Sequence, residues 1–386
     1  MQNHNLHIIA FDVPEPPDYG GAIDVFYKIK ALAAAGMQIY LHCFTYGERK
    51  QAPQLEAICK QVFYYPRRTG LRGLSLLKPY IVSSRKCPAL LRNLKDIDAP
   101  IFFEGLHTTY YLTHKALKER FKIIRTHNIE HDYYRQLYKK GKGFIKRTYF
   151  LRESKKLKRY EQRLAHAQVL MALSTADDAY FAETFPDVQH VYLPPFHAYE
   201  KPEVKTGRGG YCLYHGNLAH PENIEAVNFL LKEVAPRVKL PFIIAGRNPS
   251  PKMAALCEQV HKCQLISNPA AEQMTDLLQN AQIIVLPTYQ VSGMKLKLLD
   301  SLYSGRHVLV NDQMLHGTGL DDICHIANSP IEFIDYITEL QHVPFTVDDV
   351  ISRSVFMVRN FDNAINAQKI ITSLPQISPA QNPAQS

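Results

Sequence analysis

Hydrophobic residues along the chain follow two alternating patterns. Short runs rich in Val, Ile and Phe predict buried strands, and longer stretches with apolar residues at helical spacing predict the helices between them. In the first half, the runs that predict strands are Leu6–Phe11, Gln38–Phe44, Val62–Tyr65, Pro100–Glu104, Lys122–Thr126, Gln168–Leu173 and His190–Leu193. Because strands alternate with helices, residues 1–195 are predicted to form a parallel α/β sheet.

The same alternation resumes after a break. Residues 194–210 are rich in Pro, Gly and charge without periodicity, which is typical of a linker. Further strands are predicted at Tyr211–His215, Phe242–Ala245, Gln264–Ile266, Ile283–Leu286 and Val308–Val310. We therefore expect an α/β protein of two Rossmann-like domains with a cleft between them. The expected parts are an N-terminal domain (1–195), a linker (196–209), a C-terminal domain (210–348), a helix returning to the N-terminal domain (349–374) and a disordered tail (375–386).

The stretch 283–310 predicts an anion site in the second domain. A strand leads through a glycine loop into a helix, and a helix N-terminus offers N–H groups and partial positive charge. The residues that would form the site are Ser292, Gly293, Met294, Lys295, Lys297 and Asp300. The lysines add charge for a diphosphate, and the Asp300 carboxylate could accept hydrogen bonds from a ribose diol. The alternative is an ordinary surface helix with scattered charges.

Polar residues also follow strands in the first domain. Asp12, Glu104 and His127 come at predicted strand ends, where parallel sheets bind ligands. The Gly20-Gly21 pair opens the first helix and either lets backbone approach a ligand or makes a plain tight turn. The chain contains no GxGxxG and no GxxxxGK[ST], so a dinucleotide fingerprint and a P-loop are unsupported.

His127, Glu130 and His131 spell HxxEH, the inverted zinc-peptidase pattern. His127 directly follows a predicted strand and no third ligand is evident, so a metal site is not expected. We expect His127 to project from the strand end and orient a hydroxyl, with a structural histidine as the alternative.

Charge is distributed unevenly along the 386 residues. Residues 1–200 hold 30 Lys and Arg against 19 Asp and Glu, a net charge of +11, whereas the remainder holds 15 against 17. Within the first half, 139–163 holds 11 basic and 2 acidic residues interleaved with apolar ones. Such a basic amphipathic helix could rest on an anionic membrane surface, track nucleic-acid phosphates or simply pack on its own domain. Nucleic acid is the least favoured of the three.

Other features indicate a cytoplasmic protein. No apolar run of about 18 residues is present, so no membrane-spanning helix is predicted. The N-terminus lacks the pattern of a signal peptide. The seven cysteines are scattered without a CxxC and are expected to be reduced thiols.

Several motifs occur in an order that resembles one family. They are DVPEPPDYGGAIDVFYKIKALAAAGMQIYL, RTHNIEHDYYRQL, YEQRLAHAQVLMALSTADDAYF, YHGNLAHPENIEAVNFLLKEV, LPFIIAGRNPS and the stretch 283–310. Together they resemble GT-B glycosyltransferases of the large retaining family 4 (glycosyltransferase group 1). The resemblance implies a UDP- or GDP-linked sugar donor held mainly by the C-terminal domain and an acceptor held mainly by the N-terminal one. It also implies retention of configuration without a metal or a cofactor.

The resemblance assigns roles to particular residues. Asp300 falls at the second acidic position of the family's E-x7-E pair, and Ser292 replaces the first, which leaves the donor sugar open. Arg247, Lys295 and Lys297 would replace the basic pair that usually neutralises the diphosphate. The implied donor-site residues are Gly20, Gly21, Gly216, Asn217, Arg247, Ile266, Ser267, Asn268, Ser292, Gly293, Met294, Lys295, Lys297 and Asp300. His127, Lys297 and Asp300 are the expected catalytic residues, and Asp12, Glu104 and His127 are expected near the acceptor or the donor sugar.

The expected function is therefore sugar transfer to a cell-surface glycan or a lipid-linked acceptor, as in polysaccharide biosynthesis. We expect the protein to lie in the cytoplasm, peripheral to the inner membrane face. The alternatives are a GT-B epimerase of nucleotide sugars and a non-catalytic module that binds membrane or nucleic acid.

Overall fold

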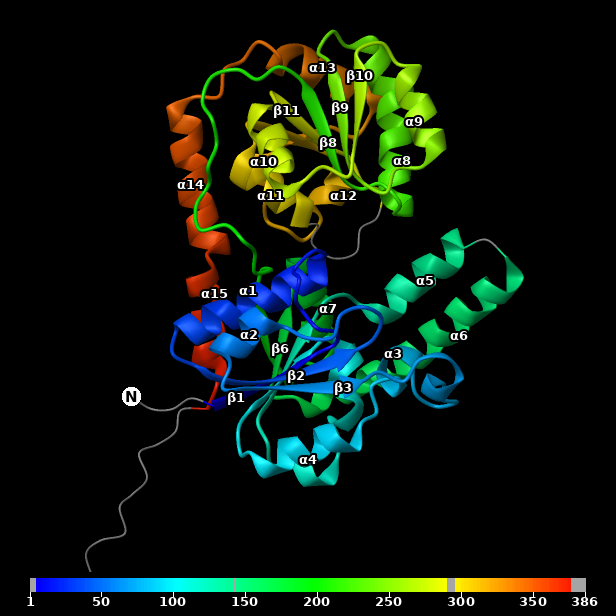
Figure 1. Cartoon of the computed structure of the whole chain (residues 1–386), viewed down its shortest axis with the longest axis vertical. Coiled ribbons are helices and arrows are strands. Elements are labelled where there is room, and N and C mark those ends of the chain that lie inside the picture. The colour runs from blue at the N-terminus through cyan, green and yellow to red at the C-terminus, as the bar shows by residue number, and fades with distance from the viewer. Residues whose placement is uncertain (1–4, 142, 290–295, 376–386) are drawn as a thin grey trace, which may run out of the picture. The chain divides into compact units, whose positions relative to one another are not determined.

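The computed structural model describes residues 5–141, 143–289 and 296–375, and the chain divides into two compact units (Figure 1). Unit 1 is formed by the chain up to residue 173, residues 177–198 and the chain from residue 363. Unit 2 is formed by residues 174–176 and 199–362. Each unit has its own parallel sheet and its own hydrophobic core.

Unit 1 contains a seven-stranded parallel sheet in the order β3-β2-β1-β4-β5-β6-β7. Its strands are β1 (Asn5–Ala10), β2 (Gln38–Thr45), β3 (Gln61–Pro66), β4 (Ile101–Glu104), β5 (Lys122–Thr126), β6 (Val169–Ala172) and β7 (Gln189–Tyr192). Its helices are α1 (Gly20–Ala34), α2 (Pro53–Ile58), α3 (Tyr80–Ser83), α4 (Pro88–Asp96), α5 (Glu130–Lys140), α6 (Phe144–Glu161), α7 (Thr175–Thr184) and α15 (Asn363–Ser373). The chain order reverses between β1 and β4, and such a switch point is where open α/β sheets bind ligands.

Helices cover both faces of this sheet because its strands are apolar on both sides. In β4, Phe102 joins the core beneath α1 and α15, whereas Ile101 and Phe103 join the core on the opposite face. This alternation follows from the two-residue repeat of a strand. The C-terminal helix α15 contributes Ala367 and Ile370 to the core of unit 1.

Unit 2 contains a six-stranded parallel sheet in the order β10-β9-β8-β11-β12-β13. Its strands are β8 (Cys212–Asn217), β9 (Phe242–Arg247), β10 (Cys263–Ser267), β11 (Ile283–Leu286), β12 (His307–Val310) and β13 (His325–Ile326). Its helices are α8 (Pro221–Phe229), continued by a π-helical turn at Leu230–Val234, α9 (Pro251–Glu258), α10 (Ala271–Asn280), α11 (Leu296–Ser304), α12 (Asp312–Leu315), α13 (Pro330–Leu340) and α14 (Val347–Phe361).

The predicted fold class is confirmed, because both halves form parallel Rossmann-like sheets and each predicted strand is present. Two helical patterns differ in detail. The basic segment 139–163 spans two helices, because α5 and α6 are separated around Gly143, which has a left-handed φ of 88°. The last apolar pattern forms α14, which packs on unit 2 through Met357 and Phe361, and then α15 on unit 1. Across the described ranges, no helix has both the length and the apolar character needed to span a bilayer.

Candidate functional site

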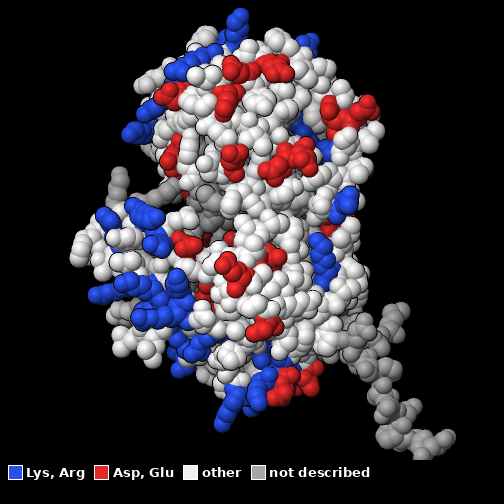
Figure 2. Space-filling view, turned by 180° about the vertical axis from the view of Figure 1, so that it is seen from behind, with Lys and Arg blue, Asp and Glu red and all other residues white. Residues whose placement is uncertain are grey.

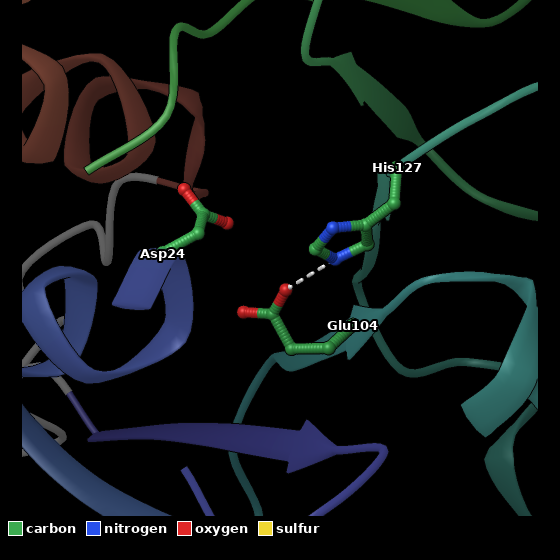
Figure 3. A group of neighbouring side chains, drawn as sticks. All are labelled: Asp24, Glu104 and His127. Carbon is green, nitrogen blue, oxygen red and sulfur yellow. Dashed lines mark hydrogen bonds and ion pairs between the residues drawn. The ribbon is translucent and has the colours of Figure 1, made fainter. Parts of the chain in front are cut away.

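The carboxyl edge of the unit 1 sheet gathers ionisable side chains at the switch point. Glu104 is the last residue of β4, and His127 follows β5, the neighbouring strand. Asp24 reaches the same place from α1, and the three side chains point toward one another (Figure 3). His127 Nε2 lies 3.2 Å from Glu104 Oε2. The structure thus brings together two of the predicted residues and one that the sequence analysis missed.

Lys28 connects the two carboxylates of this group. Its ammonium donates to Glu104 Oε1 at 2.7 Å and to Asp24 Oδ2 at 3.0 Å, and the side chain is fully buried. It also lies 5.2 Å from the centre of the Phe102 ring, within reach of a cation–π contact. The positive charge of this buried lysine is therefore balanced by the two carboxylates, as a buried ammonium requires.

Arg125 compensates Asp24 from the other side. This arginine lies in β5, next to the middle strand β4, is fully buried, and donates to Asp24 Oδ1 at 3.0 Å. It also donates to the carbonyl oxygens of Leu193 and Pro194. The Asp24 carboxylate accepts a further hydrogen bond from the Phe196 backbone N–H. The result is a buried network of two carboxylates and two cations.

The network keeps its carboxylates ionised. Burial alone would raise the pKa of Asp24, but Arg125 and Lys28 outweigh it and hold that pKa well below the usual range. The pKa of Glu104 is also lowered, because Lys28 and His127 outweigh its burial. An ionised carboxylate only accepts hydrogen bonds, so Nε2 of His127 carries a proton toward Glu104. In the neutral ring, Nδ1 is then the acceptor.

Asp24, Glu104 and His127 also have the spacing of metal ligands, with one donor atom from each lying within 4.8 Å of the others. The residues fit a metal poorly, however. Lys28 already places a positive charge between the two carboxylates, so a metal ion would have to displace the ammonium or be repelled by it. We therefore assign the group as an ion-paired network, and metal-free chemistry stays a prediction.

The HxxEH residues do not converge on one site. His131 Nδ1 lies 3.1 Å from Glu161 Oε2 in the core, whereas His127 contacts Glu104. Glu130 is buried, and that burial raises its pKa to about 8. Among the described residues, neither Glu130 nor His131 belongs to a group of three candidate metal ligands. The pattern therefore arises from a strand end followed by a helix start.

The remaining predicted residues of unit 1 have local partners. Asp12 is buried and accepts hydrogen bonds from the Val13 N–H and the Tyr19 hydroxyl. Gly20 and Gly21 form the first turn of α1. A Cβ at Gly21 would lie 2.7 Å from the Phe11 ring, so close packing accounts for that glycine.

The carboxyl edge of the unit 2 sheet is built around Lys297, in the first turn of α11. Its ammonium donates to Asn223 Oδ1 at 2.9 Å and to the Tyr214 hydroxyl at 3.1 Å. Asn223 in turn donates to the Asn217 carbonyl at the end of β8. Lys297 is thus held over the end of the central strand by a phenol and an amide.

Asp300 lies one turn further along α11 and is half-buried. Its Oδ1 accepts a hydrogen bond of 3.1 Å from the Tyr199 hydroxyl, and Tyr199 stacks on Tyr303 with ring centres 4.8 Å apart. Burial raises the pKa of Asp300 to about 6, and the Tyr199 hydrogen bond partly offsets this effect. The carboxylate is mostly ionised at neutral pH.

Other predicted donor residues lie along the same edge. Gly216 and Asn217 end β8, and Arg247 ends β9 with an exposed side chain. Ile266 and Ser267 end β10, and Asn268 directly follows it. The sheet needs glycine here, because a Cβ at Gly246 would lie 1.8 Å from the Gly216 carbonyl oxygen. The predictions at Ser292, Gly293, Met294 and Lys295 lie outside the described residues.

Comparison with known proteins finds a matching family model and solved structures of similar fold. Residues 209–342 match the family model described as Glycosyl transferases group 1. TarM has a TM-score of 0.67 at 9% identity, covering 96% of this chain and 98% of TarM. An α,α-trehalose-phosphate synthase (UDP-forming) from Burkholderia vietnamiensis has a TM-score of 0.61 at 10% identity, covering 96% of this chain and 99% of that one.

The fold is GT-B. At these identities the similarity to solved structures shows the fold alone, and the family match adds a glycosyl transferases group 1 domain over 209–342. A curated relative, described as an uncharacterized 44.6 kDa protein in the cps region of Klebsiella pneumoniae, is 24% identical over 349 residues. That alignment covers 86% of this chain and 89% of the relative. These findings support a GT-B glycosyltransferase.

Sequence reasoning missed several residues of the two GT-B edges. Asp24 and Lys28 stand four apart on the apolar face of α1, and such a charged pair on a core face could have indicated a buried network. Arg125 inside an apolar strand was a similar signal. Tyr199 lies in the segment interpreted as a linker, and nothing in its local pattern indicates its bond to Asp300.

Proposed function

We propose that the protein is a retaining family 4 glycosyltransferase that moves a sugar from a nucleotide-diphosphate donor to a glycan or lipid-linked acceptor. The observation that carries the proposal is the edge of unit 2, where Lys297 and Asp300 stand on α11 within the residues that match the glycosyl transferases group 1 model. Three residues apart, they lie on the same side of α11, as a cation for a diphosphate beside an acceptor for a ribose would.

Each residue of the donor edge has a proposed role. The Lys297 ammonium binds the diphosphate and opposes the negative charge that grows on it as the anomeric C–O bond breaks. Asp300, which is ionised at neutral pH, accepts hydrogen bonds from the ribose hydroxyls. Arg247 adds exposed positive charge, and the backbone at 266–268 contacts the base. The donor is proposed to be UDP- or GDP-linked.

Unit 1 is proposed to guide the transferred sugar or the acceptor through His127. Glu104 orients the ring through Nε2, which leaves Nδ1 as the acceptor for a sugar hydroxyl. In a retaining reaction the donor phosphate itself takes the proton of the acceptor hydroxyl, so His127 need not be the base. The relative in a cps region supports a polysaccharide as the setting of the reaction.

A thermal-shift panel of UDP-, GDP- and ADP-linked sugars tests the proposal. We expect at least one of them to raise the unfolding temperature of the wild type, and the stabilised donor then to be hydrolysed slowly, with release of the nucleoside diphosphate. NMR of the glycoside formed once an acceptor is supplied gives the anomeric configuration, because a glycoside does not mutarotate, and inversion would contradict the retaining assignment. Failure of the whole panel to stabilise the protein would contradict the donor site.

A further inference from the structure

The most exposed apolar side chains of the described chain lie on two segments of unit 1. Among the described large apolar residues, those exposed by 85% to 94% are Leu71, Leu76, Leu77, Phe144 and Ile145. The next in rank, Ile331, is 66% exposed. Leu74, which lies between Leu71 and Leu76 in the chain, is 53% exposed. Single exposed apolar residues need no explanation, but a cluster of them marks an interaction site.

Two segments distant in sequence form this face. The loop 71–77 lies beside the start of α6 (Figure 1), and a groove of about 510 Å³ separates them. The apolar side chains that line the groove are Leu74, Leu76, Phe144, Ile145 and Tyr149. We call the loop 71–77 together with 144–149 the leucine face.

Hydrogen bonds hold the loop against α6. Lys156 donates to the Ser75 carbonyl at 2.8 Å, and the Tyr80 N–H donates to Glu153 at 2.6 Å. Lys156 also pairs with Glu153 at 2.8 Å. The leucines are therefore presented by an anchored loop, although their own side chains reach into solvent.

Positive charge flanks the leucine face. Helix α6 carries seven basic residues and two acidic ones, and both acidic residues, Glu153 and Glu161, are buried. Its exposed charge is therefore only positive, from Lys146, Arg147, Arg152, Lys155, Lys158 and Arg159. Figure 2 shows Lys and Arg gathered over α5 and α6, at the left edge of the view.

We propose that the leucine face docks unit 1 on a membrane that contains anionic lipids, with the leucines, Phe144 and Ile145 entering the interface. Aliphatic side chains gain free energy on leaving water for the acyl boundary, and the cations of α6 attract anionic headgroups. Nucleic acid is a weaker match, because binding to single strands relies on aromatic stacking and this face is mainly aliphatic. The inference is independent of the proposed sugar transfer.

Sedimentation of the full chain with lipid vesicles tests the proposal. The wild type should bind phosphatidylglycerol-containing vesicles at low salt, bind phosphatidylcholine vesicles much less, and be released as salt increases. The double variant Leu76→Ser/Leu77→Ser should lower the partition coefficient at least about tenfold. Lys155→Gln/Arg159→Gln should lower it about tenfold or more on the anionic vesicles alone.

A matched control uses exposed apolar residues of unit 2. The variant Ile331→Ser/Val355→Ser also replaces two exposed apolar side chains, which are 66% and 64% exposed, and should bind as the wild type does. Because all these side chains are exposed, thermal unfolding of each variant should match that of the wild type. The proposal is overturned if the wild type does not bind anionic vesicles, if the leucine variant binds them unchanged, or if a single-stranded oligonucleotide binds tightly while vesicles do not.

Discussion

The carboxyl edges of the two sheets use acidic residues in opposite ways. In unit 1, Asp24 and Glu104 are buried, and Lys28 lowers the pKa of both carboxyls, together with Arg125 at Asp24 and His127 at Glu104. In unit 2, Asp300 is hydrogen-bonded to a phenol, and burial raises its pKa to about 6. In unit 1 the described cations outweigh the effect of burial on both carboxyls, whereas at Asp300 burial outweighs the Tyr199 hydrogen bond.

This difference indicates what each edge does. Charges that are neutralised inside the fold stabilise the fold and orient neighbours, as Glu104 orients His127. At the other edge, the Lys297 ammonium donates to a phenol and an amide, and we propose that it also meets the charge of the donor. We therefore propose that unit 1 orients the transferred sugar or the acceptor and that unit 2 binds the charged donor.

The largest effect is expected from Lys28→Met. Removing this ammonium leaves two buried carboxylates without one of their cations, which should reduce the free energy of unfolding by about 3–5 kcal/mol. Urea denaturation followed by circular dichroism measures the change. The control Lys30→Met alters an exposed lysine on the same helix and should cost no more than about 0.5 kcal/mol. A loss below about 1 kcal/mol for Lys28→Met would show that the network is not a structural unit.

Lys297→Met should make the enzyme use its nucleotide-sugar donor less efficiently. Loss of the charge opposite the diphosphate should lower kcat/KM for the nucleotide sugar about 100-fold. Steady-state kinetics with the donor found in the thermal-shift panel provides the measurement, and Lys252→Met on α9 is the exposed control. If kcat/KM is unchanged while thermal stability falls, Lys297 is a structural residue and the contrast between the edges fails.

Asp300→Asn should weaken donor binding about tenfold, because an amide is a poorer acceptor for a ribose diol. Because burial raises the pKa of Asp300 to about 6, the donor affinity of the wild type should increase as the pH rises from 5 to 7. The donor affinity of Asp300→Asn should not change over that range. The free energy of unfolding depends on pH in the opposite sense. Because the pKa of Asp300 is raised in the folded state, this group contributes stability below about pH 4, and the contribution is lost as the pH rises through about 6. A wild-type affinity without pH dependence would contradict the ribose role.

Arg247→Gln should have the smallest effect. This side chain is exposed, so solvent screens its charge and the donor affinity should fall only about two- to threefold. Titration at low and high salt checks this, because the difference from the wild type should shrink as salt increases. A loss as large as that of Lys297→Met would mean that the diphosphate lies closer to β9 than to α11.

The fold could be predicted because strands and helices depend on local patterns. Apolar runs such as 283–286 and 101–104 are buried on both faces, and the chain alternates them with helices throughout. Strand ends of a parallel sheet meet at one edge, so the sequence alone is enough to expect Glu104 and His127 near each other.

The partners of these residues could not be predicted in the same way. Lys28 reaches Glu104 across 76 residues, and Tyr199 reaches Asp300 across 101, so tertiary packing alone decides both contacts. The loop 71–77 has no periodicity, and only its place beside α6 shows that its leucines remain exposed. The basic segment is evident from its composition, but its break into α5 and α6 depends on the conformation at Gly143.

The central claim is that α11 presents a cation and a carboxylate to a nucleoside diphosphate. Isothermal titration of UDP and of GDP into the wild type, Lys297→Met, Asp300→Asn and the control Lys252→Met tests it most directly. One nucleotide should bind the wild type and the control equally, and bind both α11 variants at least about tenfold more weakly. If neither nucleotide binds the wild type, or if both variants bind as the wild type does, the donor edge described for unit 2 is wrong.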